Sequence, residues 1–205
     1  PHTLPCGLMI PLCIARETAS HADTYATGSS TTIVIAITAR RMIRRGRVGD
    51  AGGAGGADHS VNEGLPIGVC RRAIRAEPVW WLESARRLDA AGYKGVWCWD
   101  HFMGRGDAAV PVVENWTILA MAAAQTSRIT VGPFVLNVMN RHPALVARMA
   151  ATLQIASGGR LVLGIGIGGA PREHAAYGMD FPETPERVAR LEEAVAVIRA
   201  LWTGG

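Results

Sequence analysis

The amino-acid sequence predicts an α/β fold built on a parallel sheet. Four short apolar runs begin near residues 65, 95, 130 and 161, and each interval of roughly 30–35 residues holds one stretch with helical periodicity. This alternation is the βαβ repeat, in which a helix returns the chain to the start of the next parallel strand. The runs are apolar on both faces, as strands covered by helices on each side must be. Two architectures fit, a doubly wound open sheet and a (β/α)₈ barrel, and both place chemistry at the carboxyl ends of the strands.

The first two repeats are marked by turn and cap signals. Leu65–Cys70 predicts a strand, and Pro78 opens a helix that Gly92 closes. Gly95–Trp99 predicts the second strand, and residues 114–127 predict the second helix. The apolar side chains of the first helix share one face, which we expect to be buried: Trp81, Leu82, Ala85, Leu88 and Ala91.

Two further repeats complete the pattern. Ile129–Leu136 predicts the third strand, Pro143–Ser157 the third helix and Leu161–Ile165 the fourth strand. Thr184 then caps a helix that has Pro185 in its first turn. Its buried side is expected to carry Val188, Leu191, Val195, Ile198 and Trp202.

Residues 1–63 differ in character, because no hydrophobic period persists there for more than a few residues. The run Ala-Gly-Gly-Ala-Gly-Gly-Ala at residues 51–57 is typical of a flexible linker. We therefore predict a poorly structured leader or a non-native extension over residues 1–63 and a domain of about four βα units over residues 64–205. The apolar run Thr31–Thr38 is far shorter than the ~20 residues of a membrane-spanning helix, and we expect a strand there.

Composition argues against several classes of function. The net charge of +4 comes from 21 basic and 17 acidic residues scattered along the chain, so neither a nucleic-acid nor a membrane partner is expected. The four cysteines form no Cys-x-x-Cys pair and have no histidine at ligand spacing, which argues against a metal site or a disulfide framework: Cys6, Cys13, Cys70 and Cys98. A reducing, cytoplasmic setting fits this cysteine usage.

The second and third strands end in residues that could carry chemistry. Asp100-His101 follows the second strand, where a histidine beside a carboxylate suits proton transfer or the polarisation of a bound ring. A histidine that merely satisfies its hydrogen bonds in a loop fits the same pattern. The third strand carries Gly132-Pro133, which predicts a bulge against which a flat ligand could rest, or else an edge irregularity.

A glycine-rich loop follows the fourth strand. Gly164, Gly166 and Gly169 formally match the dinucleotide fingerprint, but the match follows the fourth strand rather than the first. A loop kept free of side chains, so that its backbone can approach a ligand closely, is the favoured interpretation. Two charged clusters have simpler explanations: His142 is expected in a turn before a helix, and Arg172-Glu173-His174 in structural ion pairs.

Taken together, these segments resemble the luciferase-like monooxygenase superfamily, in particular its branch of coenzyme F420-dependent (deazaflavin) oxidoreductases. The resemblance runs from about residue 65 to the last residue and rests on the order and spacing of several motifs. These are residues 85–93, Trp99-Asp100-His101-Phe102, Asn140-Arg141-His142-Pro143-Ala144-Leu145, Ala150-Ala151-Thr152-Leu153, Ser157-Gly158-Gly159-Arg160-Leu161, Leu163-Gly164-Ile165-Gly166 and residues 187–202.

The resemblance implies a (β/α)₈ barrel with a flavin or deazaflavin ring at the strand ends. Residues 64–205 would supply its N-terminal half, truncated at the C-terminus. The family's ring-contacting aspartate and histidine map onto Asp100 and His101. His101 would be catalytic, moving a proton or steadying charge on the ring, and Asp100 would orient it.

The cofactor-binding positions follow from the same resemblance. The bulge of the third strand, which in this family often holds a non-prolyl cis peptide behind the ring, maps onto Phe134-Val135, and Leu136 and Asn137 follow it. The loop that faces the cofactor after the fourth strand maps onto Gly166-Ile167-Gly168. No metal ligand is implied.

We therefore expect an oxidoreductase that transfers a hydride between a small organic substrate and coenzyme F420, with FMN as the alternative cofactor. The sequence departs from the sugar-phosphate dehydrogenases of the family, which carry a glutamate where Gly169 stands and a helix aspartate where Gln154 stands. Three other functions stay open. They are an oxygen-using flavin monooxygenase, a non-catalytic cofactor-binding half barrel and a Rossmann-type NAD(P) enzyme. A half barrel would need its missing C-terminal half or self-association into a homo-oligomer.

Overall fold

The chain forms one arc of a (β/α)₈ barrel. The computed structural model describes residues 24–25, 34–37, 67–104, 107 and 109–203. Strands β3 (Gly68–Arg71), β4 (Gly95–Cys98) and β5 (Thr130–Pro133) pair in parallel. Their register aligns Val69 with Val96, and Val96 with Val131.

The fourth strand of the arc is β7 (Leu163–Gly166), which pairs in parallel with the short strand β6 (Leu136–Asn137). A parallel bridge between Val131 and Leu161 joins β5 to the chain entering β7. The described parallel strands therefore follow one another in chain order. A doubly wound sheet requires a reversal of this order, so that alternative is wrong and the barrel architecture is confirmed.

The third strand is interrupted between β5 and β6, as the Gly132-Pro133 pair predicted. The peptide bond between Phe134 and Val135 is cis, at the position that the resemblance implied. Close packing at this break requires glycine both in β5 and in the neighbouring strand β7. A Cβ on Gly132 would lie 2.0 Å from the carbonyl oxygen of Val162, and one on Gly164 would lie 2.7 Å from the carbonyl oxygen of Pro133.

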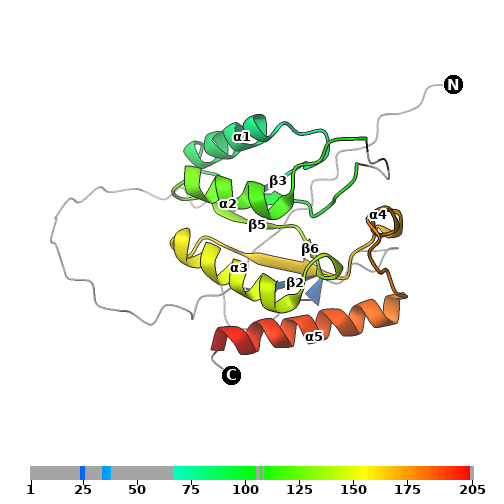
Figure 1. Cartoon of the computed structure of the whole chain (residues 1–205). Helices are drawn as coiled ribbons and strands as arrows, with labels where there is room; N and C mark the ends of the chain where they lie inside the picture. Colours follow the sequence, from blue (N-terminus) through cyan, green and yellow to red (C-terminus); the bar gives the residue numbers. More distant parts are fainter. Residues whose placement is uncertain (1–23, 26–33, 38–66, 105–106, 108, 204–205) are drawn as a thin grey trace.

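Helices α1 (Pro78–Ala90), α2 (Asn115–Gln125), α3 (Pro143–Ala156) and α5 (Thr184–Thr203) form a single outer layer. Each packs against the next in chain order, and Figure 1 shows them stacked in that order beside the strands. Between β7 and α5 lies a short helix, α4 (Pro171–Ala176), that the periodicity did not predict. The other four helices agree with the predicted ranges to within a few residues.

The core lies between this helical layer and the strands. Burying each large apolar side chain contributes roughly 1.5–3 kcal/mol relative to exposing it. The largest fully buried side chains come from both layers: Trp81, Val96, Leu119, Ile129, Val131, Leu136, Val146, Leu163, Ile165, Leu191 and Ile198. Of the predicted buried faces, Ala91 is exposed, because it is the C-cap of α1.

Part of the chain before the barrel also pairs with it. Strand β1 (Thr24–Tyr25) pairs antiparallel with β2 (Val34–Ile37), and β2 pairs antiparallel with β7, with Ile35 opposite Ile165. The strand expected within Thr31–Thr38 is therefore present. The rest of the predicted leader, including the glycine-rich linker, Cys6 and Cys13, lies outside the described residues. Within the described part of the chain, no helix has the length and apolar character needed to cross a membrane.

Two polar side chains tie the elements together at the amino ends of the strands. Asp89, near the end of α1, accepts hydrogen bonds from the backbone N–H groups of Ser127, Arg128 and Ile129 at 2.7–3.1 Å. Burial by itself raises the pKa of Asp89, but these donors outweigh it and the pKa is lowered. Arg160, just before β7, donates to backbone carbonyls at the end of α2 and at Ile129.

Replacing Asp89 by alanine should lower the free energy of unfolding by about 2–3 kcal/mol, because three backbone donors lose a charged acceptor. Asp89→Asn, which keeps one acceptor oxygen, should cost less. Because the folded-state pKa is lowered, the contribution of Asp89 is present at neutral pH and is lost as the pH falls through that pKa. Urea unfolding at pH 7 measures the loss. Glu83→Ala on the same helix is the control and should cost clearly less, because its pairs with Arg86 and Arg87 are exposed to solvent. Equal losses for the two alanine variants would contradict this role.

Candidate functional site

Polar side chains gather at the carboxyl ends of β4, β6 and β7 and contact residues of α4. Figure 1 shows α4 beside the label of β6. Asp100 and His101 follow β4, Asn137 ends β6 and the glycine-rich loop follows β7. In a (β/α)₈ barrel this is the end that carries chemistry, whereas the opposite end serves stability.

Asp100 is the centre of this group. Its side chain is 1% exposed, and Oδ2 accepts hydrogen bonds from the backbone N–H of Asn137 at 2.9 Å and from Nδ2 of Asn140 at 3.1 Å. Nη1 of Arg141 lies 3.0 and 2.9 Å from the two carboxylate oxygens. The carboxylate thus joins the end of β4 to β6 and to the 3₁₀ turn η1 (Val138–Asn140).

Arg141 lies between two carboxylates. Its second amino group, Nη2, donates to Oε1 of Glu114 at 2.5 Å. Glu114 in turn caps α2, because its carboxylate accepts from the backbone N–H groups of Trp116 and Thr117. Burial alone lowers the pKa of Arg141, but the two carboxylates outweigh this effect and the pKa is raised.

Asn137 connects this cluster to α4. Its Nδ2 group donates to Oδ1 of Asn140 at 3.0 Å and lies 3.2 Å from Nε2 of His174. The Nδ1 atom of His174 lies 3.0 Å from the carbonyl oxygen of Ala170, which can only accept. Nδ1 therefore carries the proton and Nε2 accepts from Asn137, which fixes His174 as one neutral tautomer.

The glycine-rich loop is held from both sides. Gly168 has a φ of +75°, and a Cβ there would lie 2.4 Å from Oδ1 of Asn137. Arg187 on α5 donates to the carbonyl oxygen of Gly168 at 2.7 Å. Gly169 differs, since a Cβ at that position would meet no atom within 4 Å. The loop therefore presents a rigid backbone at the strand ends.

His101 pairs with a carboxylate from α4. Its Nδ1 atom lies 3.1 Å from Oε2 of Glu173, and the backbone N–H of Met103 donates to the same oxygen at 3.3 Å. The hydrogen bond to Glu173 raises the pKa of His101 despite partial burial. Burial by itself raises the pKa of Glu173, but the hydrogen bond from His101 and nearby backbone amides lower it more.

The structure brings most of the predicted site residues to one end of the sheet. Asp100, Leu136, Asn137 and the loop from Gly166 to Gly168 lie there with the Phe134-Val135 break. One expectation is wrong: within the described chain, the carboxylate hydrogen-bonded to His101 belongs to Glu173, because Asp100 is already engaged with Asn137, Asn140 and Arg141.

The sequence assigned no role to Arg141, Glu114 or Asn140, and it predicted structural ion pairs for His174, which instead contacts Asn137 and the carbonyl oxygen of Ala170. Two features of the sequence could have indicated the first three residues. Asn140 and Arg141 lie in the Asn-Arg-His-Pro-Ala-Leu motif that carries the family resemblance, and Glu114 begins a predicted helix. The ion pair expected at Glu173 exists, but its partner is His101 rather than a neighbour in sequence. His142 caps α3 through Nδ1, as expected for a residue in the turn before a helix.

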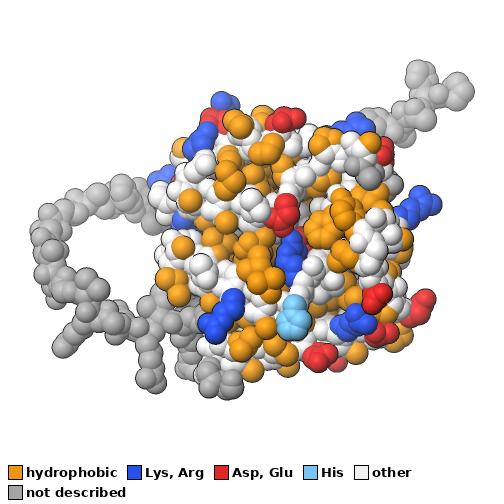
Figure 2. Space-filling model, viewed as in Figure 1, with side chains coloured by type: hydrophobic (Ala, Val, Ile, Leu, Met, Phe, Trp, Pro, Cys, Tyr) orange, Lys and Arg blue, Asp and Glu red, His pale blue; other side chains and the backbone are white. Residues whose placement is uncertain are grey.

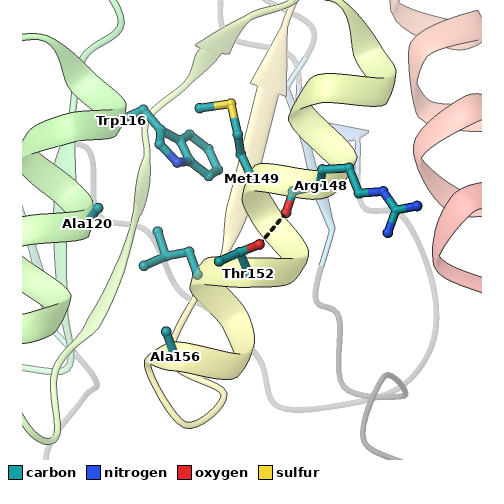
Figure 3. Close-up of a pocket in the computed structure, with 7 residues that line it drawn as sticks. Trp116, Ala120, Arg148, Met149, Thr152 and Ala156 are labelled. Carbon is teal, nitrogen blue, oxygen red and sulfur yellow. Dashed lines mark hydrogen bonds between the residues drawn. The ribbon is translucent and has the colours of Figure 1, made fainter.

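The described residues contain no group of three or more His, Cys, Asp and Glu side chains placed to hold a metal ion. A groove of about 430 Å³ lies elsewhere, between α2 and α3 in the outer layer (Figure 3). Its lining is mostly apolar, with Trp116 and Met149 among its residues, and Figure 2 shows hydrophobic side chains over these two helices. It carries none of the acid–base groups of the strand ends.

Comparison with known proteins gives a consistent match. The family model described as luciferase-like monooxygenase matches residues 76–205. The F420-dependent glucose-6-phosphate dehydrogenase of Amycolatopsis mediterranei is 36% identical over 142 residues, which cover 68% of this chain and 42% of the relative. The chain thus spans about two fifths of the length of such curated relatives.

Two solved structures extend the comparison. An F420-dependent secondary alcohol dehydrogenase in complex with an F420-acetone adduct is 29% identical, with a TM-score of 0.60 over 66% of this chain and 41% of that one. The oxygenating constituent of 3,6-diketocamphane monooxygenase from Pseudomonas putida, in complex with FMN, is 26% identical. Its TM-score is 0.53, over 61% of this chain and 34% of that one.

Replacing Arg141 by alanine should lower the free energy of unfolding by about 3–5 kcal/mol, because the buried carboxylate of Asp100 loses its counter-charge. Arg141→Lys should recover part of the loss, since it restores the charge but not the two-armed geometry. Denaturant titration compares these variants with Arg190→Ala, which removes an exposed pair with Glu186 on α5. A loss for Arg141→Ala as small as that of the control would show that the buried pair does not hold the site together.

Proposed function

Because the chain belongs to the luciferase-like monooxygenase family, we propose that it forms the cofactor-facing part of an F420-dependent oxidoreductase. In this proposal two electrons pass as a hydride between the deazaflavin ring and a small organic substrate. The observation that carries the proposal is the likeness to F420-dependent dehydrogenases in both sequence and structure, over the segment that builds the strand-end site.

The residues present fit a flat, ring-shaped group. The interrupted third strand offers half-buried Phe134 and Val135 beside the fully buried Leu136. The loop opposite has glycine at Gly168, where a side chain would collide with Asn137. Gly168 therefore packs against the Asn137 side chain and leaves backbone rather than a side chain at this strand end, as close approach to a planar ligand requires.

In this mechanism the bound deazaflavin supplies the hydride chemistry, and the protein supplies position and electrostatics. Phe134 and Val135, backed by the buried Leu136, would hold the ring together with Asn137 and the backbone of residues 166–168. Asp100 acts through Asn137, whose backbone N–H it holds. His101 donates or accepts the proton that accompanies hydride transfer, because its side chain is 40% exposed at the strand ends.

The substrate is proposed to be a small alcohol or carbonyl compound rather than a sugar phosphate. The structural relative with an acetone adduct supports a small carbonyl partner. Glycine stands at Gly169, where the resemblance places a glutamate in sugar-phosphate dehydrogenases. The structure leaves room for a side chain there, so the glycine is not imposed by packing.

A flavin monooxygenase is the second candidate, favoured by the FMN complex of a structural relative. With FMN in place of the deazaflavin, the reduced ring could react with oxygen. Oxygen uptake in the presence of reduced cofactor separates the two candidates, since deazaflavins resist oxygen. We also propose a cytoplasmic enzyme whose strand-end site is completed by further barrel segments or by a second copy of the chain.

Replacing Gly168 by alanine should weaken coenzyme F420 binding by roughly tenfold or more, because the new Cβ is strained at positive φ and displaces Asn137. Gly169→Ala is the matched control, one residue away with open space, and should bind within about twofold of the original chain. Titration of the coenzyme's absorbance measures both. Equal binding by the two variants would argue against a cofactor at this loop.

His101→Ala should slow hydride transfer by about 10²-fold or more, the usual contribution of a positioned acid or base. The rate of change in deazaflavin absorbance with a panel of small secondary alcohols and ketones measures it. His142→Ala removes a histidine that only caps α3 and should leave the rate unchanged. An undiminished rate for His101→Ala would remove His101 from the mechanism.

A further inference from the structure

Glu173 is a buried carboxylate with one unused oxygen. It is 3% exposed, and its Oε2 atom accepts from Nδ1 of His101 and from the backbone N–H of Met103. Its other oxygen, Oε1, is buried without a hydrogen-bond partner among the described residues. A buried carboxylate is costly unless it is paired, and His101 is the side chain that pairs with it, assisted by backbone amides.

We propose that Glu173 is a positioning residue that fixes the tautomer of His101 and leaves Nε2 as the atom that exchanges a proton with the substrate. The assignment of a substrate proton to His101 rests on the proposed function. The tautomer itself rests on the geometry alone.

The chemistry of the pair determines the tautomer. An ionised carboxylate can only accept, so the nitrogen facing Glu173 keeps its proton in both charge states of the ring. Gain and loss of a proton are thereby confined to Nε2. Within the described residues Nε2 of His101 has no hydrogen-bond partner, and the side chain is 40% exposed. This nitrogen is thus unengaged among the described residues, on a side chain that is partly exposed at the strand ends.

Two carboxylates act on His101 in the same direction. Glu173 on α4 and Asp100 on the loop after β4 both raise its pKa, with Glu173 the larger cause. Trp99 meets the ring edge-on at 6.2 Å and adds no charge. The positive charge of Arg141 lies against Asp100 and offsets that carboxylate. Glu173 is therefore the carboxylate that contributes most to the raised pKa of His101.

The position of Glu173 is set by its neighbour in sequence. His174 hydrogen-bonds with Asn137, so consecutive residues of α4 reach the loops after β4 and β6. This helix follows the glycine-rich loop directly, and Glu173 stands five residues after Gly168. The segment proposed to face the cofactor is thus continuous with the residue that orients His101.

The test compares Glu173→Gln with the original 205-residue chain by ¹⁵N NMR of the histidine ring nitrogens across a pH titration. In the original chain His101 should show protonated Nδ1 when neutral, and it should titrate above the ordinary value near 6.5. Glutamine removes the charge and keeps the shape, so the midpoint should fall measurably toward the ordinary value. Glu173→Asp, which keeps the charge, should recover part of the shift.

Glu192→Gln on the exposed side of α5 is the matched control and should leave the His101 signals unchanged. A His101 that keeps its midpoint in Glu173→Gln, or that shows protonated Nε2 in the neutral original chain, would overturn the proposal. Thermal unfolding shows whether each variant is folded. If Glu173→Gln does not fold, Glu173→Asp is compared with the original chain instead.

The turnover arm separates this proposal from the proposed function. With coenzyme F420 and a reactive alcohol, the His101 limb of the kcat/KM pH profile should move in Glu173→Gln by the same amount as the NMR midpoint. If Glu173→Gln turns over substrate and the His101 limb of its kcat/KM pH profile stays where it is in the original chain, the proposed role of Glu173 is overturned. An NMR shift in a chain that turns over none of the panel supports the role of Glu173 and counts against the proposed function.

Discussion

The buried carboxylate of Asp100 sets the geometry of the whole strand-end site. A charge that is 1% exposed is tolerated only when it is paired and hydrogen-bonded, and Asp100 satisfies this with Asn137, Asn140 and Arg141. Arg141 extends the requirement to Glu114, the cap of α2. The ends of β4 and β6 and the starts of α2 and α3 must therefore meet at one point, which positions the loops where the cofactor is proposed to bind.

The two ends of the sheet differ in the kind of contacts that their polar side chains make. At the amino ends, Asp89 and Arg160 engage mostly backbone groups. At the carboxyl ends, side chains engage one another, and one ring nitrogen of His101 has no hydrogen-bond partner among the described residues. Backbone partners cannot be rearranged without unfolding, whereas side-chain networks can take up or release protons. This division is the one expected for a (β/α)₈ barrel.

Periodicity and punctuation predicted the elements of the barrel arc because each depends on nearby residues. Pro78, Pro143 and Pro185 mark helix starts, and Gly132-Pro133 marks the broken strand. The short helix α4 escaped prediction because six residues show no helical period. The pairing of β2 with β7 was equally out of reach, since it joins segments that lie far apart along the chain. The two candidate architectures were separated only by the observed strand order.

Within the site, Asp100, His101 and the glycine loop follow strands, so topology predicted their common location. His101 pairs with Glu173 rather than Asp100 because α4 folds back onto the end of β4. The two residues are 72 positions apart, so the sequence around either one does not predict the contact.

The strand ends, rather than the groove between α2 and α3, are where we propose that the cofactor binds. Backbone amide NMR of the isotope-labelled chain during addition of coenzyme F420 tests this placement. We expect the largest shifts at Asp100, Asn137 and Gly168, with little change at Asp89 or Met149. Shifts concentrated at Trp116 and Met149, with none at the strand ends, would place the cofactor in the groove and refute the proposed site.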